Sequence, residues 1–164
     1  MVLRSKGFQH DRQSGIVWPF TVQGITVDVM PIDESILGFS NRWYEEGFRE
    51  AVPFQVDADY TVRIFSAPYF IASKLEAFKG RGKLDGRTSH DFEDIIYVLN
   101  HRSTIWDEME AAPTSVRSYL KNEVRALVAH PYLKEWIAAN LEHHEQARAR
   151  FIGDRLSDFV RPST

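Results

Sequence analysis

The chain of 164 residues contains no cysteine, and this absence removes a whole class of sites. Without thiols it can form neither disulfide bonds nor cysteine-ligated metal centres. It also has no apolar run close to the roughly 20 residues that a membrane-crossing helix needs. The first residues, Met1 to Lys6, lack the apolar segment of a secretory signal. We therefore expect a soluble, cytoplasmic protein with no membrane partner.

An excess of basic residues is missing too. The 20 lysines and arginines are outnumbered by 23 acidic residues, which gives a formal net charge of -3. No global positive field favours nucleic acid, so any contact with phosphate has to come from a local cluster. What the chain does have is 43% hydrophobic residues, enough in this length for one buried core.

The first part of the chain carries β patterns. Residues 16–20 and 25–30 are short β-branched or aromatic runs, and Gln23-Gly24 between them predicts a hairpin turn. Pro19 interrupts the first run, which indicates an edge strand. A short helix is predicted over 41–51, and the alternation in 60–65 predicts a third strand.

From Ser66 onward the spacing of apolar residues is helical. Ser66 and Ser89 are favourable N-cap residues. Helices are predicted over 66–79, 89–99, 115–129, 132–144 and 147–160. The fold class that follows is α+β, with a small mixed sheet followed by a C-terminal helical bundle. We expect a core over residues 1–102 and a helical region over 103–164 that packs on it as one compact unit.

Two cations lie beside the apolar stripe of the first long helix. At about 100° per residue, Lys74 and Arg81 project within about 20° of each other. On the next helix Asp91 borders the apolar stripe and Asp94 follows one turn later. If the two helices pack as a hairpin, Lys74, Arg81 and Asp91 converge. These charges could bind a ligand, or they could pair only to staple the two helices together.

Asp28 is a second candidate, because aspartate is disfavoured in the middle of a strand. A carboxylate on a rigid strand suits a metal ligand or a general base, and Mg²⁺ prefers one or two carboxylates together with phosphate oxygens. The alternative is a solvated carboxylate on a half-exposed sheet.

These residues carry a resemblance to a known family. The segments that carry it are 27–31, 36–44, 66–70, 74–78, 81–82 and 89–95. They resemble bacterial nucleotidyltransferase-like proteins of the AbiEii and MenA toxin group, within the DNA polymerase β-like nucleotidyltransferase superfamily. The resemblance covers roughly residues 7–102 and is most specific from Lys74 to Asp94.

The resemblance implies roles for particular residues. Lys74, Arg81 and Asp94 would bind the nucleotide, with Lys74 on a phosphate, and Asp91 would orient Lys74. Asp28 would be the strand-borne carboxylate, as metal ligand or base, so that Asp28, Lys74 and Asp91 form the catalytic set. A complete protein would use Mg²⁺ to transfer a nucleoside monophosphate from NTP to an RNA or protein hydroxyl. The lineage also implies a toxin of a toxin–antitoxin or phage-defence system, with a cognate antitoxin as partner.

The chain departs from the family pattern in one respect. The family's Gly-Ser turn and its Asp-x-Asp pair, which together hold phosphate and two metal ions, are absent. Asp57-Ala58-Asp59 has the spacing, but it follows Asp28 and lies beside a predicted turn. The resemblance therefore implies a nucleotidyltransferase fold without its first β-α-β portion, incomplete or inactive as it stands. A truncated enzyme, a degenerate non-enzymatic remnant that binds a nucleotide or a partner, and a site completed by another polypeptide are the alternatives.

Overall fold

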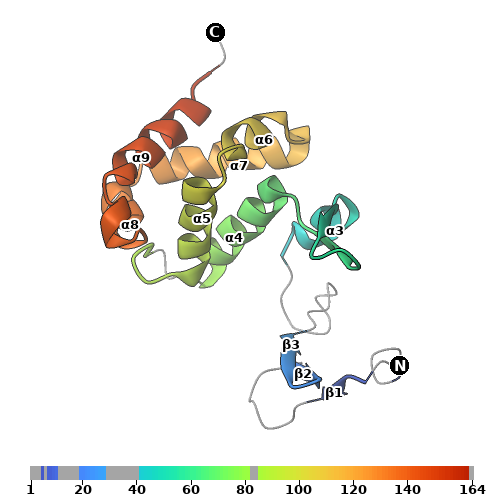
Figure 1. Cartoon of the computed structure of the whole chain (residues 1–164). Helices are drawn as coiled ribbons and strands as arrows, with labels where there is room; N and C mark the ends of the chain where they lie inside the picture. Colours follow the sequence, from blue (N-terminus) through green and yellow to red (C-terminus); the bar gives the residue numbers. More distant parts are fainter. Residues whose placement is uncertain (1–4, 6, 11–18, 29–40, 82–84, 163–164) are drawn as a thin grey trace. The chain divides into compact units, whose positions relative to one another are not determined.

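The computed structural model describes residues 5, 7–10, 19–28, 41–81 and 85–162 (Figure 1). It divides into two compact units, residues 1–40 and residues 41–164. The expected boundary between residues 102 and 103 stays a prediction. Each unit is described by itself below.

The first unit holds a three-stranded antiparallel sheet. Its strands, in the order β1-β2-β3, are Gln9–His10, Pro19–Val22 and Ile25–Asp28. Gln23 and Gly24 connect β2 to β3 with φ of 51° and 79°, the left-handed conformation that a tight hairpin requires. The predicted hairpin is confirmed, whereas the prediction that its first strand lies at an edge is wrong. Pro19 is tolerated in this central strand because it stands at the strand's first residue.

The second unit begins with a short helix and a β-hairpin. Helix α3 spans Tyr44–Arg49, and strands β4 (Val52–Gln55) and β5 (Thr61–Ile64) pair antiparallel. The sequence predicted α3 and β5 but not β4, because Pro53 argues against a strand. Within this two-stranded ribbon Pro53 faces Arg63, and both strands are exposed along their whole length.

The rest of the second unit is helical. The helices are α4 (Ala67–Arg81), α5 (His90–His101), α6 (Ile105–Ala111), α7 (Thr114–Val128), α8 (Leu133–Ala139), a 3₁₀ turn η1 (His143–Glu145) and α9 (Arg148–Phe159). The predicted helices over 66–79, 89–99, 115–129 and 147–160 are found within a few residues of their expected ends. Helix α6 was not predicted, and the helix expected over 132–144 is shorter, with η1 in its last part.

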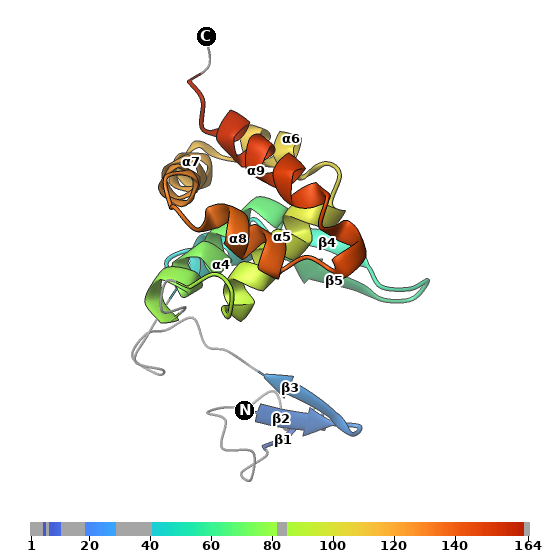
Figure 2. The ribbon, with the colours of Figure 1, turned by 90° about the vertical axis from the view of Figure 1, so that its left-hand side faces the viewer.

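Helix α4 organises the core of the second unit. It packs against α5, α6 and α7, while α9 packs against α7 and α8 (Figure 2). The aromatic rings of Phe78, Phe92 and Trp136 meet at centroid distances of 5.3 to 5.8 Å, which joins α4, α5 and α8. Burial of such rings supplies most of the driving force for this packing.

The described part of the chain is therefore α+β and mostly helical, with two small antiparallel sheets rather than one mixed sheet. No described helix is long and apolar enough to cross a membrane. Residues 43–159 contain every buried hydrophobic side chain of the described core.

Candidate functional site

Lys74 lies at the edge of the buried face of α4. Ile71, Leu75 and Phe78 on that face are each 3% exposed or less, whereas the Lys74 side chain keeps 25% of its surface. Its ammonium group lies 5.6 Å from the centre of the Phe70 ring. A helical position between the buried and exposed faces thus holds a cation that water and a ligand can both reach.

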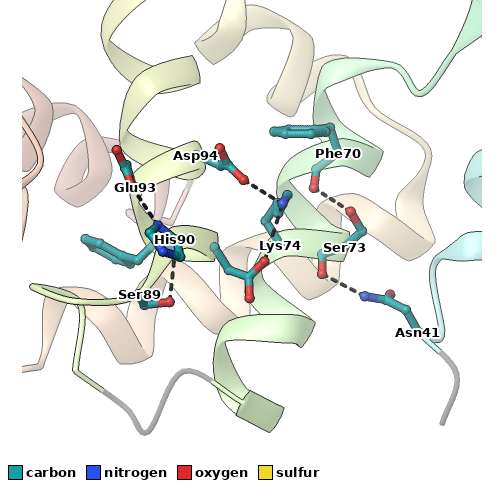
Figure 3. Close-up of polar contacts among 10 residues, drawn as sticks. Asn41, Phe70, Ser73, Lys74, Ser89, His90, Glu93 and Asp94 are labelled. Carbon is teal, nitrogen blue, oxygen red and sulfur yellow. Dashed lines mark hydrogen bonds and ion pairs between the residues drawn. The ribbon is translucent and has the colours of Figure 1, made fainter. Parts of the chain in front are cut away.

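Two carboxylates on α5 meet this cation. Lys74 Nζ lies 3.3 Å from Asp91 Oδ1 and 2.5 Å from Asp94 Oδ2. Figure 3 shows Lys74 and Asp94 facing each other across the gap between the two helices. The predicted convergence of Lys74 and Asp91 across a helical hairpin is confirmed, and Asp94 belongs to the same cluster.

The two carboxylates differ in burial. The Asp91 side chain is only 7% exposed, whereas that of Asp94 is 45% exposed. Asp91 lies in the first turn of α5, and Ser89 caps this turn by accepting a hydrogen bond from the backbone N–H of Phe92. The Asp94 carboxylate is thus in contact with both Lys74 and solvent.

Charge balance keeps Lys74 protonated. Burial by itself lowers the pKa of this ammonium group, but hydrogen bonding and charge attraction from Asp94 and Asp91 outweigh it, so the pKa lies above its ordinary value. One cation against two carboxylates leaves the cluster with a formal charge of about -1. An incoming anion therefore has to displace a carboxylate before it can bind Lys74.

Asn41, just before α3, is hydrogen-bonded to the turn of α4 that carries Lys74. Its side-chain amide donates a 2.7 Å hydrogen bond to the carbonyl oxygen of Ser73, and its Oδ1 accepts from the backbone N–H of Trp43. The Ser73 hydroxyl donates to the carbonyl oxygen of Phe70 (Figure 3). The sequence did not single out Asn41 for this role, because the contact spans 32 residues.

Asp91 and Asp94 are the predicted site residues that the described structure places beside Lys74. Arg81 is the last residue of α4, and its side chain lies outside the described part. Asp28 ends β3, opposite Pro19, in the first unit. The convergence of Arg81 and Asp28 with Lys74 stays a prediction.

Two other segments contain acidic or histidine side chains of the kind that bind metal ions. Asp57 Oδ1 accepts hydrogen bonds from the backbone N–H groups of Asp59 and Tyr60, both at 2.9 Å, and so caps the turn between β4 and β5. His143 and His144 are exposed in η1. Within the described ranges, no group of three side chains is placed to hold a metal ion.

Comparisons of the chain with family models, with curated proteins and with solved structures find no match in any of the three.

Proposed function

We propose that this chain binds a nucleoside triphosphate at Lys74, as part of a nucleotidyltransferase-type protein. The observation that carries the proposal is a partly exposed lysine held between a buried and an exposed carboxylate, 3.3 and 2.5 Å from its ammonium group. One acid would be enough for an ion pair that only links α4 to α5. A second, exposed acid on the same cation is a group that a phosphate oxygen can replace.

Asp91 and Asp94 have different roles in the proposed binding. Asp91, which is buried, orients Lys74 and holds its side chain in place whether or not a ligand is bound. Asp94, which is half-exposed, occupies the position of a phosphate oxygen and moves away when the nucleotide arrives. An exposed ion pair contributes little to stability, so a phosphate group that makes charge-assisted hydrogen bonds to Lys74 can replace Asp94.

A transfer reaction needs more than this cluster. The sequence lacks the paired acids of a two-metal centre, and the described residues offer no metal-binding group of three. We therefore propose binding for this chain, and transfer of a nucleoside monophosphate to an RNA or protein hydroxyl only for a complete site. Asp28 would supply one carboxylate for Mg²⁺ there, and a toxin with a cognate antitoxin is the physiological setting that the resemblance favours.

A second candidate is a non-enzymatic protein in which the cluster is only a staple between α4 and α5. The two ion pairs favour it, because Asp91 and Asp94 already satisfy the Lys74 cation and outweigh burial, which keeps its pKa above the ordinary value.

Thermal-shift and calorimetric titrations with ATP, GTP, CTP and UTP, each with and without Mg²⁺, separate the two candidates. We expect Lys74→Met to weaken binding roughly 10- to 100-fold, because hydrogen bonds to charged groups contribute about 1.5 to 3 kcal/mol. Asp94→Asn should strengthen binding, since it removes the competing charge from Lys74.

Lys79→Met is the matched control. Lys79 lies on the same helix and pairs with Glu123 at 2.8 Å, but it does not contact Asp91 or Asp94. The staple candidate predicts that no nucleotide binds and that Asp94→Asn only lowers the melting temperature, an outcome that would overturn the proposal.

A further inference from the structure

A cavity of about 890 Å³ lies among the end of α7, helix α8 and helix α9. Helices α8 and α9 lie side by side at this position (Figure 2). Leu133 and Ile137 from α8 and Ala149 and Gly153 from α9 give the cavity an apolar lining. Its volume lies in the range of about 300 to 1,000 Å³ that is typical of small-molecule sites.

Positive charge prevails at this cavity although the whole chain is acidic. Lys134 on α8 and Arg150 on α9 line it, against one carboxylate, Asp154. Arg150 Nε lies 3.7 Å from Asp154 Oδ2, an exposed and weak pair, and Lys134 has no ion-pair partner among the residues that the structure describes. Two basic side chains thus remain available to an anion.

Two further features favour the binding of an anion in this cavity. His130 lines the cavity, and its Nδ1 accepts a hydrogen bond from the backbone N–H of Tyr132, which assigns the proton of the neutral ring to Nε2. Helix α9 begins at the cavity with no side-chain cap and no acid in its first turn, so its positive dipole end is not neutralised there.

Gly153 keeps the cavity open. It lies in the interior of α9, where glycine costs roughly 0.5 to 1 kcal/mol relative to alanine. The neighbouring side chains do not require a glycine here, because a Cβ atom at this position would contact only Ile137 Cδ1, at an ordinary van der Waals distance of 3.9 Å. A ligand that approaches the backbone of α9 would account for the missing side chain.

We propose that this cavity binds a small organic anion with an apolar body. The apolar body packs over Gly153 and Ala149, and the carboxylate or phosphate head binds between Lys134 and Arg150. This site shares no residue with the Lys74 cluster, so its failure would leave the nucleotide proposal unaffected.

Titration of the ¹⁵N-labelled chain with decanoate, below the concentration at which it forms micelles, tests the proposal. We expect saturable shifts of the Gly153 amide resonance. Decyl phosphate in a parallel titration identifies the preferred head group, and uncharged decanol should bind at least tenfold more weakly than the preferred anion. Saturable binding of either anion supports the site.

Variants locate the binding. Gly153→Leu fills the cavity and, because its Cβ has room, should keep or raise the melting temperature while weakening binding at least tenfold. Lys134→Gln and Arg150→Gln should each weaken it several-fold, and Arg125→Gln, exposed on α7 outside the cavity, should not. No saturable shift with either anion, unchanged binding in Gly153→Leu, or equal binding of decanol would overturn the proposal.

Discussion

At the scale of single residues, several buried polar groups in the described structure have defined partners. Asn41 donates to the carbonyl oxygen of Ser73, Asn100 donates to Glu145, and Asp91 accepts from Lys74. Arg148 also contacts the side chain of Asn100 and donates to its carbonyl oxygen at 2.8 Å. An unpaired buried polar group costs about 1 to 3 kcal/mol, so these contacts fix how the helices dock.

Gly86 lies against the buried ring of Trp136, so a substitution there tests the packing at a single residue. A Cβ atom there would lie 2.7 to 2.8 Å from the buried Trp136 ring, so we expect Gly86→Ala to reduce the free energy of unfolding by about 1 to 3 kcal/mol. Urea denaturation measures the change. Gly80→Ala is the control, because nothing lies within 4 Å of its Cβ and it should leave stability unchanged or raise it. Equal effects of the two substitutions would contradict this account.

At the scale of elements, the N-cap of α5 positions two acids of the candidate site. Ser89→Ala removes the hydrogen bond to the Phe92 N–H and should cost about 0.5 to 2 kcal/mol in urea denaturation. Ser89→Asp restores an N-cap acceptor and should recover most of that loss. If the aspartate variant is as unstable as the alanine variant, the hydroxyl does not act as a cap.

The β4–β5 ribbon presents an apolar face to solvent. Its large side chains on this face are 40 to 67% exposed, namely Val52, Phe54, Val56, Tyr60, Val62 and Ile64. Exposed apolar patches promote association. We expect the double variant Phe54→Thr, Val62→Thr to lower light scattering of concentrated samples and to change the unfolding free energy by less than about 1 kcal/mol. A larger loss of stability would mean that another surface covers this face in solution.

At the scale of the whole molecule, three groups with raised pKa values make the free energy of unfolding depend on pH in the alkaline range. Burial, followed by the Glu46 and Glu76 carboxylates, raises the pKa of Tyr69 and Tyr119, respectively, and the pKa of Lys74 is raised as well. The unfolded chain loses these protons near their ordinary pKa values of about 10 to 10.4, while the folded protein retains them. Stability is therefore fully present below about pH 10 and is lost as the pH rises through the folded-state values.

Urea denaturation between pH 8 and pH 11.5, a range chosen to span about 10, the ordinary pKa of tyrosine, measures this loss. We expect Tyr69→Phe to lose stability less steeply with pH, because one of the shifted groups is gone. It should also be less stable at pH 8 by about 0.5 to 1.5 kcal/mol, since the 2.8 Å hydrogen bond to Glu46 is lost. An unchanged slope in the variant would rule out Tyr69 as a contributor.

The sequence by itself determined much of the local structure. Gly24 encoded the hairpin turn because glycine readily adopts positive φ, and Ser89 encoded the start of α5 because its hydroxyl can cap the free N–H groups. Helical periodicity also predicted that Lys74 and Asp91 border buried faces; the structure has Lys74 at such an edge, whereas the Asp91 side chain is itself buried.

Only the tertiary structure decided which elements pack against one another. Strand β4 was missed because Pro53 disfavours a strand, and its pairing with β5 is a contact between segments that local propensity does not encode. Asp94 joined the Lys74 cluster through helix docking, and the cavity beside Gly153 exists only because α8 and α9 pack together. Burial and long-range contacts depend on the whole core at once, so spacing along the chain could suggest the site but could not assign its partners.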